Sequence, residues 1–217
     1  MRTLISSLLV AGLVSFTPGA ALAGDEEAEL WFNPSATRAI NDRTVFELET
    51  AQRFRSDPRL DTFFVRAWVN REDARGTEWS VGVEQRWNGS DQQEVRLLQQ
   101  VGYSWSALDF RTRLEQRFMS DSSQTGVRIR QRVGTSVPLG EGDDAWSLAG
   151  DAELIVTLRG TEPDGQTGVT GVRTFIGFER EIGRYDLSLG YLRQQDIRDG
   201  RPDRIGHAPF IGLNTAF

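Results

Sequence analysis

The sequence contains no cysteine and no lysine, and it has a single histidine. Without cysteine, neither disulfides nor thiolate metal sites can form. No cluster of metal ligands and no glycine loop for phosphate stands out, so we expect no metal and no cofactor. The formal net charge is −6, which argues against nucleic acid as a partner because phosphate binding needs a basic surface.

All 25 basic residues are therefore arginines. The planar guanidinium pairs with carboxylates through two hydrogen bonds and stays charged when it is partly buried. This bias is compatible with charges that lie inside the protein.

The first residues have the layout of a secretory signal peptide. Arg2 is followed by an uncharged, largely apolar run from Leu4 to Phe16 and then by the small-residue tripeptide that ends at Ala23. The run is too short for a membrane-spanning helix, which needs roughly 20 apolar residues. We expect residues 1–23 to be removed on export through the general secretory route, which leaves residues 24–217 as one domain.

Residues after position 30 alternate between apolar and charged over short segments separated by turn signals. Between Phe110 and Phe118, for example, every second residue is uncharged and every residue between is charged. Alternation alone also fits a soluble sandwich with a solvated outer face. The pattern predicts an all-β protein with eleven strands, near residues 30–39, 44–54, 62–71, 77–87, 92–102, 108–118, 125–137, 146–158, 169–181, 185–195 and 207–217.

Aromatic residues on the apolar faces favour a membrane barrel over a sandwich. They occur in pairs eight residues apart, a distance that climbs roughly 20 Å along a tilted strand. Outer-membrane barrels carry two aromatic girdles around an apolar band about 25 Å tall. The predicted girdle residues are Phe46, Phe54, Trp79, Trp87, Phe110 and Phe118.

A Gln-Arg-aromatic triplet recurs around Arg53, Arg86 and Arg117, at intervals of 33 and 31 residues. This interval is about the length of one strand pair with its connections. The repeat predicts that the three arginines end alternate strands at the same height and face the barrel interior near its outer mouth.

The carboxyl end adds an independent signal. In the last predicted strand Pro209, Ile211, Leu213, Thr215 and Phe217 share one face, and the sequence stops at Phe217, as the final strand of outer-membrane barrels does on an aromatic residue. We expect Phe217 to be the signal that the barrel-assembly machinery recognises. The sequence thus predicts an antiparallel transmembrane barrel of 10–12 strands in the lipid of a bacterial outer membrane, and twelve are favoured because bacterial barrels have an even number.

The expected orientation follows from the connections. We assign the short turns at Asn41-Asp42, Ser104–Ala107 and Gly183-Arg184 to the periplasm. The connections near Asp57, Asn88, Asp121, Asp164 and Asp199 then lie outside, and Phe217 lies at the periplasmic end.

Several short motifs resemble the outer-membrane family known as domain of unknown function 2490. They are Trp31 in the first strand, the segments 111–117, 128–132 and 151–154, and the segments 173–177 and 189–194. Members usually have Asn before the arginine of the ninth strand, whereas Val172 stands here. The resemblance implies a barrel in the outer membrane, and it identifies no catalytic residues because none is established for that family.

Strand parity predicts which charged residues face the interior. Positive charge is concentrated on the inward faces of the sixth and seventh strands, where the inward residues include six arginines and, among acids, only Glu115. The predicted interior residues are Glu47, Glu49, Arg53, Arg66, Glu84, Arg86, Glu94, Arg96, Arg111, Arg113, Glu115, Arg117, Arg128, Arg130, Arg132, Asp151, Glu153, Arg173 and Glu179.

Two functions fit this interior. An arginine track could pass small anionic solutes through a narrow channel, or neighbouring acids could neutralise the arginines in a closed structural or interaction barrel. A lipid-modifying enzyme of the outer membrane is a remote alternative, because it needs a Ser and a His placed together and His207 is the only histidine. We expect a channel and no enzyme.

Overall fold

The computed structural model describes residues 24–56, 61–89, 92–142 and 144–217. The predicted signal peptide, residues 1–23, lies outside the described residues. The described part of the chain contains no helix, and hence none that is long and apolar enough to cross a membrane.

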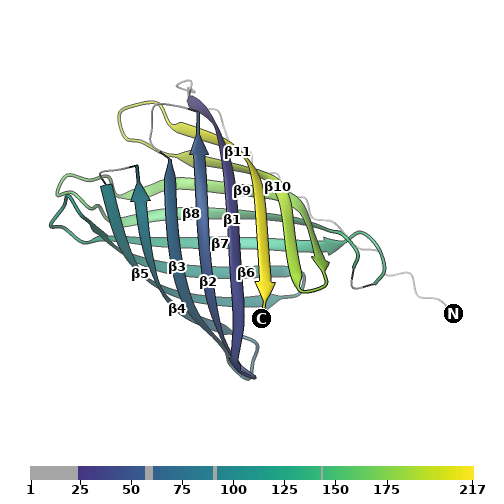
Figure 1. The fold of residues 1–217 in the computed structure, drawn as a ribbon. Helices are drawn as coiled ribbons and strands as arrows, with labels where there is room; N and C mark the ends of the chain where they lie inside the picture. The colour runs from purple at the N-terminus through teal and green to yellow at the C-terminus, as the bar shows by residue number, and fades with distance from the viewer. Residues whose placement is uncertain (1–23, 57–60, 90–91, 143) are drawn as a thin grey trace.

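Eleven strands form one closed barrel in which each strand pairs with its neighbours in sequence (Figure 1). Their bounds are β1 Asp25–Asn41, β2 Thr44–Arg55, β3 Thr62–Glu72, β4 Glu78–Asn88, β5 Gln92–Trp105, β6 Leu108–Met119, β7 Gly126–Pro138, β8 Ser147–Arg159, β9 Gly168–Ile182, β10 Tyr185–Asp196 and β11 Arg204–Ala216.

The strand count corrects the expectation of twelve. The structure has the eleven strands that the alternation predicts, and the barrel closes because β1 pairs with β11 in parallel (Figure 1). All other pairs are antiparallel, and an odd number of strands in up-and-down order can close only with one parallel pair. We call this pair the seam.

The seam also explains the largest errors in strand bounds. β1 begins five residues earlier than predicted and β11 three residues earlier, and these two extensions pair with each other, Asp25 opposite Arg204. A partner so distant in sequence leaves no local signal. The other strands agree with the prediction within three residues.

The two ends of the barrel differ in their connections. One end, the turn mouth, carries the two-residue turns 42–43, 106–107 and 183–184, the longer connections 73–77 and 139–146, and Phe217. The opposite end, the loop mouth, carries the longer connections 120–125, 160–167 and 197–203.

The outer surface of the wall is apolar and the interior is charged. On β4, for example, Trp79 and Val81 are 58% and 60% exposed, whereas Glu84 is 0% exposed. Small residues let interior rings lie flat against the wall, since a side chain at Gly82 would meet the Trp68 ring and one at Gly190 would meet Phe175. The predicted alternation is therefore present, with its charged face inside.

Introduced cysteines test the seam. Ala36 on β1 and Thr215 on β11 are partners in the parallel register, so Ala36→Cys with Thr215→Cys should form a disulfide on mild oxidation. The natural chain has no cysteine, so any disulfide that forms belongs to the introduced pair. Gel mobility without and with reductant measures the crosslink.

The matched control is Ala36→Cys with Tyr185→Cys, because Tyr185 is the partner of Thr215 on the next strand, β10. That pair is two strand spacings apart, about 9 to 10 Å, and should not crosslink. Failure of the 36–215 pair in folded protein would contradict the parallel closure.

Candidate functional site

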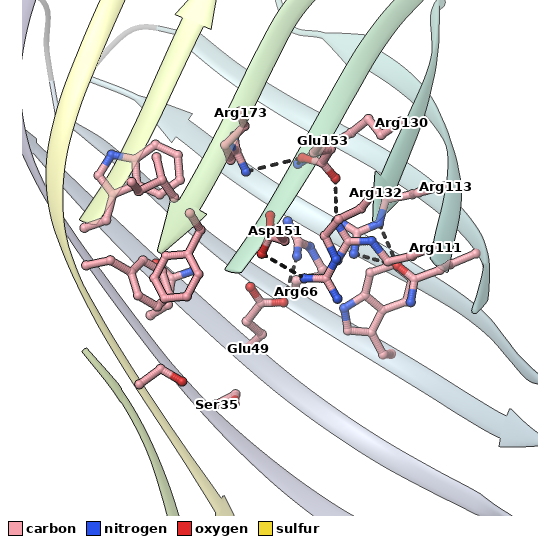
Figure 2. Close-up of a pocket in the computed structure, with 18 of the residues that line it drawn as sticks. Ser35, Glu49, Arg66, Arg111, Arg113, Arg130, Arg132, Asp151, Glu153 and Arg173 are labelled. Carbon is pink, nitrogen blue, oxygen red and sulfur yellow. Dashed lines mark hydrogen bonds and ion pairs between the residues drawn. The ribbon is translucent and has the colours of Figure 1, made fainter. Parts of the chain in front are cut away.

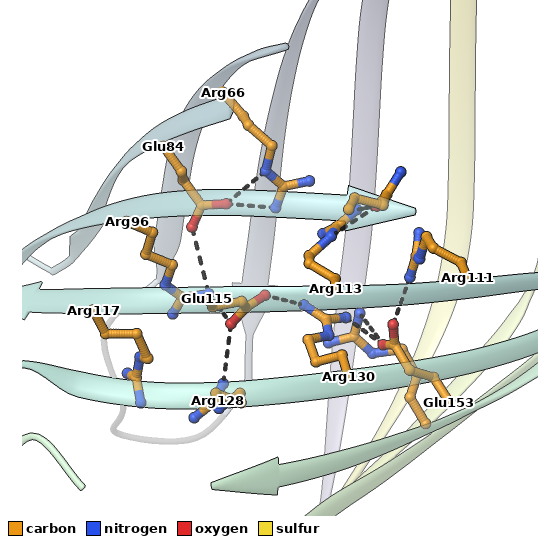
Figure 3. Close-up of polar contacts among 12 residues, drawn as sticks. Arg66, Glu84, Arg96, Arg111, Arg113, Glu115, Arg117, Arg128, Arg130 and Glu153 are labelled. Atoms are coloured by element: carbon orange, nitrogen blue, oxygen red, sulfur yellow. Dashed lines mark hydrogen bonds and ion pairs between the residues drawn. The ribbon is translucent and has the colours of Figure 1, made fainter. Parts of the chain in front are cut away.

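The candidate site is the charged interior of the barrel. Its most deeply buried acidic side chains are Glu84, Glu94, Glu115 and Glu153, and each contacts two or more arginines. Figure 3 shows this for Glu84, Glu115 and Glu153. Alternation alone places these groups inside, because every second residue of a strand points to the same face.

Glu84 on β4 is bound by arginines from three strands. Arg66 on β3 donates to Glu84 from Nε at 2.8 Å and from Nη2 as well, and Arg86 contacts the other oxygen at 2.8 Å. Arg96 on β5 lies 3.5 Å from the same carboxylate. One buried carboxylate thus faces three guanidinium groups.

Glu115 and Glu153 form a second centre, which Arg130 joins (Figure 3). Arg130 lies 3.0 Å from Glu115 and also donates to Glu153. Arg111 contacts Glu153 at 2.5 Å. Arg128 lies 3.8 Å from Glu115, which is a weaker contact.

Arginines outnumber these buried acids. Glu94 forms ion pairs with Arg96 at 2.7 Å and with Arg117 at 2.5 Å, and Arg173 lies 3.7 Å from Glu153. Eight arginines therefore share the four buried glutamates, with Glu49 as a further partner of Arg66 at 2.7 Å. Among the most deeply buried side chains, arginines therefore outnumber carboxylates.

Two buried arginines have no carboxylate partner among the described residues. Arg53 is 9% exposed, its guanidinium lies 3.7 Å from the centre of the Trp31 ring, and its Nε has no hydrogen-bond partner in this part of the chain. Arg113 is 5% exposed, donates twice to Oε1 of Gln100 at 2.9 and 2.7 Å, and lies over Trp68 at 4.8 Å. Cation–π contacts partly compensate these charges but do not neutralise them.

Three cavities follow one another through the interior. The first, of about 410 Å³, lies toward the turn mouth and is lined by Arg53, Arg66, Arg111 and Arg113 among others (Figure 2). The second, of about 310 Å³, shares Arg53, Arg130 and Arg173 with the first.

The third cavity, of about 610 Å³, lies at the loop mouth and shares Arg86, Arg96 and Asp196 with the second. Side chains of arginine therefore stand at both boundaries between the cavities. An anion that crossed the barrel would contact guanidinium groups at each boundary.

The structure places the predicted interior residues inside the barrel. Those nearest the turn mouth are less buried than the rest. Among them, Arg132 lies 3.8 Å from Asp151, and Glu179 accepts a hydrogen bond from Ser188 at 3.4 Å. The predicted pore-lining residues that the structure places inside are Arg53, Arg86, Arg111, Arg113, Glu115, Arg117, Arg128, Arg130, Arg132, Asp151, Glu153, Arg173 and Glu179.

The three repeated arginines occupy equivalent positions. Arg53 is opposite Thr62, which is opposite Asn88, so Arg86 lies two residues nearer the turn mouth than the position in register. Arg86 is in turn opposite Glu94, which is opposite Met119, so Arg117 again lies two residues nearer the turn mouth than the position in register. A tilted strand needs about one residue of offset per strand to keep a constant height, so the steps agree with one level.

The interior also contains aromatic residues, which the sequence pattern did not predict to face inward. Trp31, Phe175 and Phe210 surround buried Leu192 and Ala208 beside the seam, and Phe64 and Trp68 flank Arg66. Strand parity could have identified Phe64 and Trp68 as interior residues, because they lie two positions before and after Arg66 on the same face of β3. The cluster at the seam depends on a pairing that parity cannot predict.

The predicted girdle residues lie on the outer face. Phe46, Trp79 and Phe110 are near the turn mouth, and Phe54, Trp87 and Phe118 are near the loop mouth. Trp87 stacks on Phe63 and Phe110 stacks on Tyr103, at ring-centre distances of 5.5 and 5.1 Å.

Phe217 and His207 also lie on the outer side of the barrel. Phe217 is 69% exposed, and its backbone N donates to the carbonyl of Thr37 at 3.0 Å. His207 stacks on Tyr191 and hydrogen-bonds its hydroxyl. In the described residues, no serine hydroxyl hydrogen-bonds His207, and no group of three His, Cys, Asp or Glu side chains could hold a metal ion.

Substitution of Glu115 tests the network. Glu115→Gln removes the charge that Arg96, Arg128 and Arg130 share, and breaking a buried ion pair from one side should lower the free energy of unfolding by about 3 to 5 kcal/mol. Denaturant-induced unfolding followed by tryptophan fluorescence measures the change.

Glu179→Gln is the matched control, because Glu179 has no ion pair among the described residues and is only half-buried. Its effect should be less than about 1 kcal/mol. Equal effects of the two substitutions would show that the network does not stabilise the barrel.

Comparison with known proteins places this barrel in a family. A family model described as a protein of unknown function (DUF2490) matches residues 28–205, from β1 to the beginning of β11. An uncharacterised protein of Methylorubrum extorquens is 27% identical over 205 residues, which cover 86% of this chain and 87% of that protein. No solved structure gives a significant match. The match to the family model spans most of the chain, and the protein belongs to the DUF2490 family.

Proposed function

We propose that this protein is a bacterial outer-membrane barrel whose arginine-rich interior is a narrow pore for small anionic solutes. The observation that carries the proposal is the surplus of buried arginine in the interior, above all Arg53 and Arg113, which have no carboxylate partner among the described residues.

The distribution of side chains supports a membrane location. A soluble protein buries its apolar residues and exposes its charges. Here the outer wall exposes Trp79, Val81 and Ile176, while Glu84 and Glu115 are fully buried. Lipid around the barrel would cover the first set, and the closed wall leaves no strand edge unpaired in the membrane.

Three two-residue turns at the turn mouth support the orientation expected from the sequence, although the β7–β8 connection at that mouth, residues 139–146, is as long as the longest connection at the other mouth. Outer-membrane barrels have short periplasmic turns and longer outer loops. The turn mouth, with Phe217, would then face the periplasm, and the loop mouth would face outward. The sequence features of residues 1–23 agree with export.

The charge balance supports anions as the solutes. A buried charge is stable when an opposite charge lies beside it. Within the described part of the chain, no carboxylate forms an ion pair with Arg53 or Arg113, and both arginines line the cavity near the turn mouth. A small anion from solution would supply it, and the three successive cavities provide places for such anions.

The dense side-chain packing predicts a narrow pathway. Arg53, Arg130 and Arg173 separate the first two cavities, so passage requires these long side chains to move. We therefore expect a small conductance. A closed structural barrel would have the same residues but no continuous water path, and conductance separates the two functions.

Location is tested by fractionation of cells that express the full chain. Protein that has lost residues 1–23 should be recovered with outer membranes and should migrate on gels differently with and without boiling, because intact barrels resist detergent. Recovery from the soluble periplasm would contradict the membrane location.

Conduction is tested in planar bilayers under a salt gradient. The protein should give small current steps with a reversal potential that indicates anion preference. Arg53→Gln combined with Arg113→Gln should lower the anion-to-cation permeability ratio roughly fivefold for each charge removed, if each contributes about 1 kcal/mol.

Arg193→Gln is the matched control, because Arg193 lies on the outer face of β10 together with Tyr191 and lines none of the three cavities. Its selectivity should match that of the natural protein. Folded protein that never conducts would remove the pore function and leave the closed barrel.

A further inference from the structure

An apolar groove lies on the outer face of the barrel near the turn mouth. It has a volume of about 610 Å³ and is lined by Leu139, Ala145, Trp146, Phe178 and Leu189, together with Gly140 and Glu141. Its walls are the connection between β7 and β8 and the outer faces of β9 and β10. The groove is separate from the interior cavities.

The groove is shaped by local packing. The backbone N of Leu139 donates to the carbonyl of Trp146 at 2.8 Å, which extends the β7–β8 hairpin beyond the strands. The Trp146 ring meets the edge of Phe178 at a ring-centre distance of 6.5 Å. Leu139 and Phe178 are 56% and 49% exposed, so the described residues leave this apolar surface uncovered.

A positive group stands beside the groove. Arg180 shares the outer face of β9 with Phe178, and its guanidinium lies 5.6 Å from the centre of the Trp146 ring. Its Nε is buried and has no hydrogen-bond partner among the described residues, and Arg180 forms no ion pair within them. Guanidinium groups bind phosphate through paired, charge-assisted hydrogen bonds.

A negative group also lines the groove. Glu141, in the β7–β8 connection, lines the groove and is exposed, and it forms no ion pair within the described residues. The groove therefore combines an apolar surface, a guanidinium group and a carboxylate. An amphiphile with an acyl chain, a phosphate and an ammonium group would match all three.

We infer that this groove binds one phospholipid with an amine headgroup, such as phosphatidylethanolamine. An acyl chain lies against Trp146, Phe178 and Leu189, the phosphate is bound by Arg180, and the ammonium group faces Glu141. The inference rests on the outer-membrane location in the proposed function, since the turn mouth must meet a phospholipid leaflet, but it does not require the barrel to conduct.

Native mass spectrometry of the full protein, purified in detergent, tests the inference. The protein is titrated with phosphatidylethanolamine or with phosphatidylglycerol of the same acyl chains. One phosphatidylethanolamine should be retained in preference to phosphatidylglycerol. Arg180→Gln should weaken retention of phosphatidylethanolamine about tenfold, because a charge-assisted hydrogen bond is lost, and Glu141→Gln should abolish the preference between the lipids.

Arg193→Gln serves as the matched control, since it removes an arginine from the outer face of β10 near the loop mouth. A second measurement locates the acyl chain. Phosphatidylethanolamine brominated in its acyl chains should quench the tryptophan fluorescence of the natural protein more than that of the Trp146→Phe variant. Gel mobility before and after boiling verifies that each variant is folded.

Equal retention by Arg180→Gln and Arg193→Gln would overturn the phosphate site. Equal retention of the two lipids by the natural protein would overturn the amine headgroup. A protein that binds phosphatidylethanolamine but gives no current would remove the pore function and leave this inference standing. Recovery of the protein from the soluble periplasm would overturn both.

Discussion

The carboxylate of Glu115 has no exposed surface, and its charge is stable only because arginines from two other strands surround it. Arg96 reaches it from β5, and Arg128 and Arg130 reach it from β7. A slip of one residue in either strand would turn these arginines to the outer face and leave the carboxylate alone. The ion pairs therefore constrain strand register, and strand register in turn determines which residues form the apolar outer wall.

The way these carboxylates are shared favours arginine over lysine inside the barrel. Arg96 contacts Glu84, Glu94 and Glu115, and Arg66 joins Glu49 to Glu84. A guanidinium group presents five N–H donors in a plane and can bridge several carboxylates, whereas an ammonium group is a compact point charge. The planar guanidinium group can also lie against an aromatic ring, as Arg53 does over Trp31. A network in which one cation has several carboxylate partners, as Arg96 has, favours arginine over lysine.

Much of the fold could be predicted from the sequence because alternation is local. The segment from Phe110 to Phe118 shows both faces of β6, and the repeat around Arg53, Arg86 and Arg117 shows the regular offset between alternate strands. The parallel seam could not be predicted, since the rule of even strand numbers holds for most bacterial barrels and nothing within β1 identifies β11 as its partner. The individual ion pairs could not be predicted either. Parity places Arg130 and Glu153 inside, but which carboxylate each arginine contacts depends on side-chain conformations across several strands.

The seam differs from every other strand pair in what it requires of a folding chain. Ten pairs join strands that are consecutive in sequence, so each can form as a local hairpin with a short loop. The seam brings Trp31 opposite Phe210, residues from opposite ends of the chain. Contacts of such long range are slow to form because chain entropy must be lost before they stabilise anything. We expect the ten hairpins to assemble first into an open, curved sheet, and the seam to be both the last pair to close during folding and the first to separate when the barrel unfolds.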